Sequence, residues 1–340
     1  MRLSLVIPAY NVEKYIRRTL ISLIGQTHQG FETVIVDDGS TDNTLSVVSE
    51  TLANHPLDAK IIRQENGGVS SARNNGLRHA LGDYVVFLDG DDYLANTAVK
   101  DMLDAADSCN EADCICWKST RVTESEAANS TFQSDSDRLE YLTLSGSEAL
   151  KHIICEGSMQ ICTGSVAFRR DMLLRYGLEY TPGCSNGEDQ EFGYKALSHV
   201  RQLVWINRIN IFYLQRSGSI TNRFDLSRFD SLNAMKRTSA YLSASDNPEI
   251  LAVSDHIRNI LMIQDYFYNL ESCYVNSGMK AKEFLNYIDA HFQGLAKDMI
   301  GYMNHHDKVR LKLRLKMCIF KISPALLLWL VKALRLRTTV

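Results

Sequence analysis

The feature that most constrains the fold is an alternation, over the first 117 residues, of short β-branched runs with amphipathic segments. The apolar runs predict buried strands at residues 3–7, 33–36, 60–62, 84–88 and 113–117. The segments between them carry apolar residues at three- and four-residue spacing, which predicts helices at 13–23, 43–52, 70–80 and 96–106. Repeats of this kind form parallel strands joined by right-handed crossovers. We therefore predict an α/β fold with a mostly parallel sheet flanked by helices.

The rest of the chain has a different pattern. Residues 119–137 are rich in Ser, Thr and Glu and lack clear periodicity, which predicts a surface excursion, with structure resuming near residue 147. Further strands are expected at 160–168 and 202–214, on either side of a glycine-containing loop at 180–189. We expect a domain at 1–221, made of halves 1–118 and 119–221, and a helical C-terminal region at 222–340 with a basic amphipathic tail at 308–340.

The charge of the chain is unevenly distributed. The 340 residues are 45% apolar and 23% charged, an ordinary globular composition that excludes collagen-like, disordered and small disulfide-scaffold classes. The net charge is −3, but residues 1–307 carry −12 and residues 308–340 carry +9. A basic tail indicates a polyanionic partner. We favour an anionic membrane surface, because Trp and Leu accompany the cations, over nucleic acid, for which no recognition motif is present.

Two other roles for the tail stay open: a helix packed back on the rest of the chain, and a homodimer contact. The apolar runs are too short for a spanning helix, and the N-terminus predicts a first strand rather than a signal peptide. The eight cysteines lack zinc-site spacing and are expected to be reduced. We expect a cytoplasmic protein, peripheral on the inner face of the cell membrane.

Polar loops follow four of the predicted strands, and in such sheets ligands bind beyond the carboxyl ends of the strands. Asp89 and Asp91, with Gly90 between them, can present carboxylate oxygens to Mg²⁺ or Mn²⁺, the ions that suit a metal-bound diphosphate. The same pattern also occurs in solvated turns. Its position at a predicted strand end favours the metal interpretation.

Two further loops at this edge have both a binding and a structural interpretation. Gly67 and Gly68 precede a predicted helix that carries Arg73, an arrangement that could hold phosphates or form an ordinary turn. Asp38 could accept hydrogen bonds from a base or ribose, or cap a helix.

Glu188 and Asp189 lie at a predicted junction between a loop and a helix. A carboxylate there could take the proton of an attacking hydroxyl, or simply interact with the helix dipole. His152 has no partners at ligand-like spacing, so we expect it to be solvated or satisfied within the structure.

Four segments, in order, resemble bacterial family 2 glycosyltransferases: Val6–Asn11, Val34–Asp42, Asn66–Asn74 and Phe87–Asp92. The resemblance resumes at Arg169–Arg170, Gly187–Phe192 and Arg216–Thr221, and then fades. It implies a GT-A, Rossmann-like fold that binds a nucleotide sugar and inverts the anomeric centre during transfer.

The resemblance also implies roles for individual residues. The nucleoside would contact Pro8, Ala9, Tyr10 and Asp38. The diphosphate, ribose or donor sugar would contact Arg73, Asp89, Glu188, Arg216, Ser219 and Thr221. Asp91 would bind the metal and Asp189 would be the base. Leu214 stands where many relatives have another arginine, so the diphosphate would depend more on Arg216 and the metal.

The expected activity is a metal-dependent transfer of a hexose or N-acetylhexosamine from a UDP-sugar to a polyprenyl-diphosphate-linked saccharide, in bacterial surface polysaccharide synthesis. The alternative is a non-catalytic nucleotide-sugar-binding or scaffolding subunit. A dehydrogenase and a P-loop enzyme are disfavoured because neither glycine-rich fingerprint is present.

Overall fold

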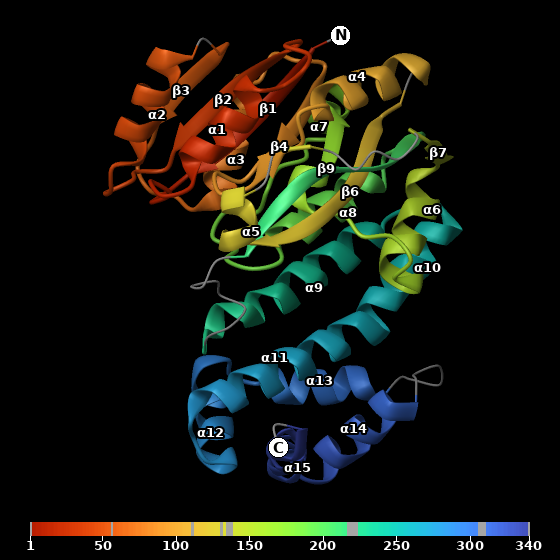
Figure 1. The fold of residues 1–340 in the computed structure, drawn as a ribbon. Coiled ribbons are helices and arrows are strands. Elements are labelled where there is room, and N and C mark those ends of the chain that lie inside the picture. Colours follow the sequence, from red (N-terminus) through yellow and green to blue (C-terminus); the bar gives the residue numbers. More distant parts are fainter. Residues whose placement is uncertain are drawn as a thin grey trace. The chain divides into compact units, whose positions relative to one another are not determined.

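The computed structural model describes residues 2–55, 57–109, 112–129, 132–133, 139–215, 224–304 and 311–338. The chain divides into two compact units, Met1–Ser217 and Gly218–Val340. The first unit contains the sheet, and the second is helical (Figure 1).

The first unit alternates strands and helices before it becomes irregular. Its first half contains β1 (Leu3–Ala9), α1 (Ile16–Ile24), β2 (Phe31–Asp37), α2 (Thr44–Asn54), β3 (Ala59–Arg63), α3 (Val69–His79), β4 (Tyr84–Phe87), β5 (Tyr93–Leu94) and α4 (Ala98–Ser108). Its second half contains β6 (Cys114–Thr123), α5 (Glu124–Asn129), β7 (Tyr141–Leu144), α6 (Gly146–Leu150), the π-helical turn η1 (Lys151–Glu156), the 3₁₀ turn η2 (Thr163–Ser165), β8 (Val166–Arg169), α7 (Arg170–Arg175), α8 (Glu188–Leu197) and β9 (Leu203–Gln215).

The strands form one mixed sheet in the order β3–β2–β1–β4–β8–β6–β9–β5, with β7 paired to β9. The β3–β2–β1–β4 half is parallel throughout. Strand β8 is antiparallel to both β4 and β6 and joins the two halves. The predicted α/β fold, a mostly parallel sheet flanked by helices with a helical C-terminal region, is confirmed.

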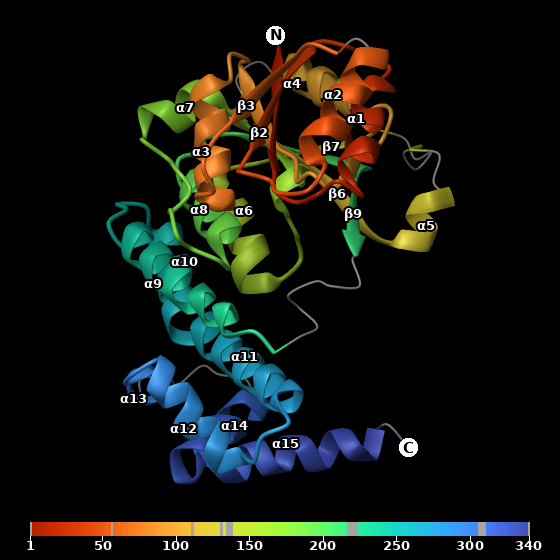
Figure 2. The ribbon, with the colours of Figure 1, turned by 90° about the vertical axis from the view of Figure 1, so that its left-hand side faces the viewer.

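Helices cover both faces of the parallel half. In Figure 2, α3 lies on one side of β1 to β3, and α1 and α2 lie on the other. Helix α3 approaches β1 closely because it has a glycine at the contact: a Cβ on Gly76 would lie 2.2 Å from Cγ1 of Val6. The core between these layers consists of strand residues such as Leu5, Ile7 and Ile35, all fully buried.

Three predicted boundaries of regular structure were wrong in the second half of the first unit. Strand β6 continues to Thr123 because residues 119–123 pair with β9; their burial alternates with period two. The predicted excursion contains helix α5 at Glu124–Asn129, and strand β7 begins at Tyr141, before residue 147. The strand predicted at 160–168 is confined to Val166–Arg169, because the Ser165 hydroxyl bonds back to the amide of Cys162 and closes the turn η2.

The second unit contains only helices among its described residues, as expected for the region beyond residue 221. They are η4 (Leu226–Phe229), α9 (Asp230–Leu242), α10 (Pro248–His256), η5 (Ile257–Leu261), α11 (Met262–Ser277), α12 (Ala281–His291), α13 (Leu295–Met303), α14 (Leu311–Ile322) and α15 (Pro324–Thr338). Its core contains the aromatic rings of Phe229, Tyr266, Phe267 and Phe320. Across the described ranges, no helix is both long and apolar enough to cross a bilayer.

Candidate functional site

The loops after β1 and β2 are held together at the edge of the sheet. Pro8 and Ala9 end β1 and are buried, whereas the Tyr10 side chain is 47% exposed. The next residue, Asn11, has a φ of 52°, a conformation that Asn tolerates better than most residues. Its side-chain oxygen accepts a hydrogen bond from the amide of Thr41 at 2.9 Å. Tyr10 is therefore presented to solvent beside the second loop.

Asp38 is buried and organises the loop that precedes α3. Its carboxylate accepts hydrogen bonds from the amides of Gly67 at 2.9 Å and Gly68 at 2.8 Å, and from the Gln64 side chain at 2.7 Å. Gly68 has a φ of 83°, which explains the need for glycine there. The two amides that the sequence offered as a phosphate site are thus bonded to Asp38 instead.

Arg73 on α3 connects two parts of the chain that are distant in sequence. Its guanidinium is buried, and it donates to Asp89 at 2.7 Å and to Glu188 at 3.1 Å. Burial acts to lower the pKa of Arg73, but Asp89 and the other acidic neighbours raise it overall. The cation is therefore fixed between the end of β4 and the start of α8.

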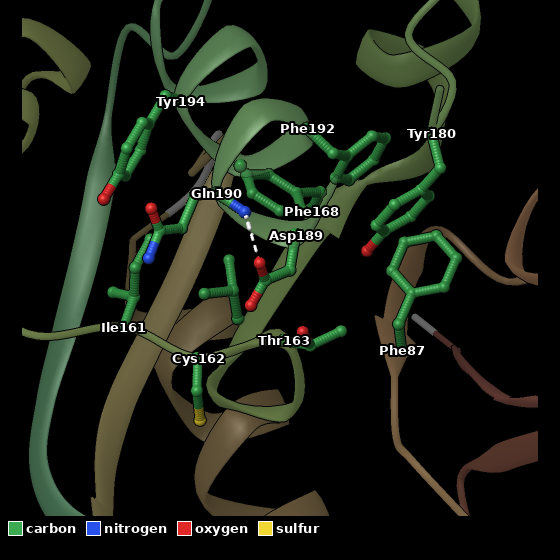
Figure 3. Close-up of a pocket in the computed structure, with 12 residues that line it drawn as sticks. Phe87, Ile161, Cys162, Thr163, Phe168, Tyr180, Asp189, Gln190, Phe192 and Tyr194 are labelled. Atoms are coloured by element: carbon green, nitrogen blue, oxygen red, sulfur yellow. Dashed lines mark hydrogen bonds between the residues drawn. The ribbon is translucent and has the colours of Figure 1, made fainter. Parts of the chain in front are cut away.

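The two carboxylates that begin α8 point in different directions. Glu188 bonds to Arg73; burial raises its pKa, the neighbouring Asp189 raises it further, and Arg73 opposes both effects. Asp189 accepts a hydrogen bond from the backbone amide of Gln190 at 2.8 Å and lines a small pocket of about 30 Å³ (Figure 3). Asp189 is thus the carboxylate of the pair that remains available to a ligand.

An aromatic cluster holds α8 against the end of β4. Phe87 on β4 makes edge-to-face contacts with Tyr180 and Phe192, at centroid distances of 5.1 and 5.5 Å. Tyr180 in turn stacks on Phe192 at 4.1 Å. All three rings line the pocket of Asp189 (Figure 3). Because Asp89 follows Phe87 by two residues, this packing fixes Asp189 near Asp89.

Tyr213 on β9 lies close to the same group of carboxylates. Burial raises its pKa to about 12, and four carboxylates add to the rise. These carboxylates are Asp92, Asp89, Asp91 and Asp189. Tyr213 therefore faces the acidic loop after β4, which Arg73 ties to the start of α8.

The acidic loop after β4 contains one structural carboxylate and two that could bind ligands. Asp92 is buried and accepts a hydrogen bond from the amide of Leu214 at 3.0 Å, so it fixes β9 to the loop. Asp89 and Asp91 are only partly buried. The described residues contain no group of three or more His, Cys, Asp or Glu suited to a metal ion. Two carboxylates with ligand phosphates and water are the usual set for Mg²⁺, so these residues fit such an ion.

Three predicted site residues, Arg216, Ser219 and Thr221, lie outside the described residues. Conversely, Tyr180 and Tyr213 belong to the site but were not singled out from the sequence. Tyr213 falls within a correctly predicted strand, where alternation with buried Leu214 would have suggested an exposed ring next to the acidic loop.

Comparison with known proteins gives matches along the same segments. The family described as "Glycosyl transferase family 2" matches residues 4–177. "Putative glycosyltransferase EpsH" of Bacillus subtilis is 29% identical over 246 residues, 72% of this chain and 70% of that protein. Chondroitin synthase of Escherichia coli is 46% identical over 101 residues, 30% of this chain but only 15% of that longer protein.

Solved structures match over a larger part of the chain. S. aureus TarS 1–349 in complex with UDP-GlcNAc superposes with a TM-score of 0.69 at 21% identity, over 99% of this chain and 92% of that one. At this identity the likeness concerns the fold.

Proposed function

The chain belongs to glycosyl transferase family 2, and from this premise we propose that it transfers a hexose or N-acetylhexosamine from a UDP-sugar to a saccharide acceptor, with inversion. The observation that supports the proposal is that Arg73 bonds to both Asp89 and Glu188, so that Asp189, the residue after Glu188, starts its helix close to the acidic loop. An inverting transfer needs a proton acceptor and a charge-stabilising group at one anomeric carbon, on opposite sides of it.

In the proposed reaction, Asp189 takes the proton of the acceptor hydroxyl as its oxygen bonds to the anomeric carbon. The bond from that carbon to the diphosphate breaks, and UDP leaves with the electron pair. In the family-based assignment, Arg73, fixed by Glu188 and Asp89, would face the donor diphosphate or sugar. Preorganised charge of this kind stabilises the transition state more than the ground state.

The donor's nucleoside would lie against Pro8, Ala9 and the exposed ring of Tyr10, with Asp38 holding the adjoining loop. UDP is the nucleotide we propose, since TarS, which shares the fold, was solved with UDP-GlcNAc. In the family-based assignment, Arg216, Ser219 and Thr221, which lie outside the described residues, would contact the diphosphate.

A divalent ion, Mn²⁺ or Mg²⁺, would be held by Asp91 together with the donor phosphates, and Asp89 would contact the ribose or donor sugar. When bound, such an ion neutralises charge that develops on the leaving diphosphate. We expect a strong requirement for the ion, because Leu214 contributes a buried apolar side chain at the position where the family resemblance implies an additional arginine.

We propose a lipid-linked acceptor because the C-terminal helices expose apolar residues among cations. One face of α14 is buried, with Leu313, Met317 and Phe320 in the core of the helical unit. The opposite face carries Leu311, Leu315, Cys318 and Ile322, at spacings of four, three and four residues. Of these, Leu311 and Ile322 are each 82% exposed.

Helix α15 also exposes apolar side chains. Its start is as predicted, with the Ser323 hydroxyl accepting from the amide of Leu326 and Pro324 at the first helical position. It packs through Leu327 and Leu328, and it exposes Trp329 to 61%. Exposed apolar side chains in a segment, residues 308–340, whose sequence has nine cations and no acidic residue suit an anionic lipid surface at the cytoplasmic face of the membrane.

The membrane proposal is tested by flotation of the full chain with vesicles of phosphatidylcholine, with and without phosphatidylglycerol. Wild type should float with the anionic vesicles, and the double variant Leu315→Glu, Ile322→Glu should not. Leu251→Glu, at a 37% exposed position on α10, is the control and should float. Equal flotation of wild type and the double variant would refute membrane binding through these side chains. If wild type does not float and the double variant loses dimers that wild type forms, the exposed face is instead a homodimer contact.

The activity is tested by incubating the protein with UDP-glucose, UDP-galactose, UDP-GlcNAc and UDP-GalNAc in Mn²⁺ and measuring release of UDP. At least one donor should be hydrolysed slowly without an acceptor, and Asp189→Asn should slow the release by about 10²–10⁴. Tight donor binding without release from any donor, with or without added acceptor lipid, would instead indicate the scaffolding subunit.

A further inference from the structure

A second hollow of about 500 Å³ lies in the first unit, on the side of β6, β7 and β9. Its apolar wall includes Trp205 on β9 and Leu142 on β7, which are direct partners across the two strands. Lys118 on β6 and His152 on the π-helical turn η1 contribute polar groups. None of these residues has a part in the donor site described above.

This cavity adjoins the pocket of Asp189 through one loop. Ser158, Met159 and Gln160 line the larger cavity, and the next three residues, 161–163, line the Asp189 pocket. Ser119 makes a second connection. Burial raises the pKa of the Cys162 thiol, and the hydroxyls of Ser165 and Ser119 oppose that rise, so Ser119 lies beside a residue of the Asp189 pocket.

The two hollows differ in what they can hold. The Asp189 pocket, at about 30 Å³, has room for a water-sized group such as one hydroxyl. The larger cavity falls within the range of roughly 300–1,000 Å³ that is typical of small-ligand sites. A saccharide that places a hydroxyl at Asp189 must therefore extend elsewhere, and the larger cavity adjoins that position.

The lining of the larger cavity matches the chemistry of a sugar ring. The indole of Trp205 is only partly buried, and an aromatic face of this kind packs against the C–H face of a sugar. Lys118, Ser119, Gln160 and His152 surround it with groups that bond to hydroxyls. Within the described part of the chain, Lys118 has no acidic partner, so its charge is available to a ligand.

The π-helical turn orients the polar side of this cavity. Its residue His152 contacts the Glu156 carboxylate at 2.8 Å and the Ser158 hydroxyl at 3.0 Å through the same ring nitrogen. The sequence predicted only a solvated or satisfied histidine here. The contacts fix the ring at the rim of the cavity, and π-helical turns often mark functional sites.

We propose that this cavity is an acceptor subsite that binds a sugar unit of the acceptor saccharide. Trp205 would stack against the sugar ring, and Lys118 would donate hydrogen bonds to its hydroxyls. The proposal rests on the proposed glycosyltransferase function. Beyond that function, the proposal states that the protein recognises at least one sugar unit of the acceptor in addition to the attacking hydroxyl.

The test uses an array of defined saccharides probed with the full-length protein in the presence of UDP and Mn²⁺. At least one saccharide should bind, and the affinity for it, measured by titration, should fall about tenfold in Trp205→Ala and in Lys118→Ala, the loss expected for one stacking or charged contact. Leu174→Ala is the control, because Leu174 on α7 is 49% exposed and lies outside the cavity.

Binding that is lost in both cavity variants and retained in the control supports the subsite. No bound saccharide, or equal affinity in wild type and both cavity variants, overturns it. Trp205 and Lys118 lie on different strands, so a folding defect in one variant would not explain a loss of saccharide binding in both. The melting temperature of each variant identifies such a defect. Acceptor-independent donor hydrolysis by wild type tests the proposed function separately.

Discussion

Replacing Arg73 by Met should destabilise the first unit strongly, because Arg73 is the only buried cation that holds Asp89 and Glu188 together among the described residues. Its side chain is 3% exposed, whereas those of Asp89 and Glu188 are 30% and 13% exposed. Breaking a buried ion pair costs about 3–5 kcal/mol, since it leaves a charge buried without a partner. We expect about 3 kcal/mol, the lower end of that range, because Asp89 can be hydrated and Glu188 already has a raised pKa and can take up a proton.

The assay is urea unfolding followed by tryptophan fluorescence, since the fully buried Trp117 reports on the sheet. Arg78→Met is the matched control on the same helix: Arg78 pairs with Glu179, but both side chains are 56% exposed. Exposed pairs contribute only about 0–1 kcal/mol. The double variant Arg73→Met, Glu188→Gln should recover part of the loss. If Arg73→Met costs no more than Arg78→Met, the buried cation does not fix the two carboxylates and the reasoning is refuted.

Two further predictions concern metal and pH. Asp91→Ala should weaken UDP binding, measured by calorimetry, in Mn²⁺ but not in EDTA; an equal loss in both would argue against a metal ligand at Asp91. Burial lowers the pKa of His199 below that of an ordinary histidine, so the unfolded chain takes up a proton first as the pH falls below about 6.5, and stability declines from there. His199→Gln should make the melting temperature less dependent on pH between about 7 and 5, and an unchanged slope would contradict this.

The parallel half of the fold could be predicted from sequence because each of its elements has its own periodic pattern. Helix α3 and strand β4, for example, begin within one residue of their predicted starts. The direction of β8 could not be predicted, since an apolar run specifies a strand but not its partners. The run of residues 119–123 was too polar to suggest a strand, and it is held by its pairing with β9.

In the candidate site, too, features set by neighbouring residues could be predicted from sequence, whereas contacts between distant segments could not. The acidic loop after β4 could be located because it directly follows an apolar run. The packing of Tyr180 and Phe192 on Phe87 could not be predicted, because these contacts join segments about a hundred residues apart. Likewise, nothing local shows that the Gly67 and Gly68 amides bond to Asp38.

The most direct measurement is the turnover of Asp189→Asn with the best donor, compared with its affinity for UDP in Mn²⁺. If the carboxylate that begins α8 removes the acceptor's proton, kcat should fall by about 10²–10⁴. The affinity for UDP should stay within a factor of about two, because the affected contact is to the acceptor hydroxyl. Asp171→Asn, at a 62% exposed position on α7, should match wild type. Turnover of Asp189→Asn close to that of wild type would contradict the account.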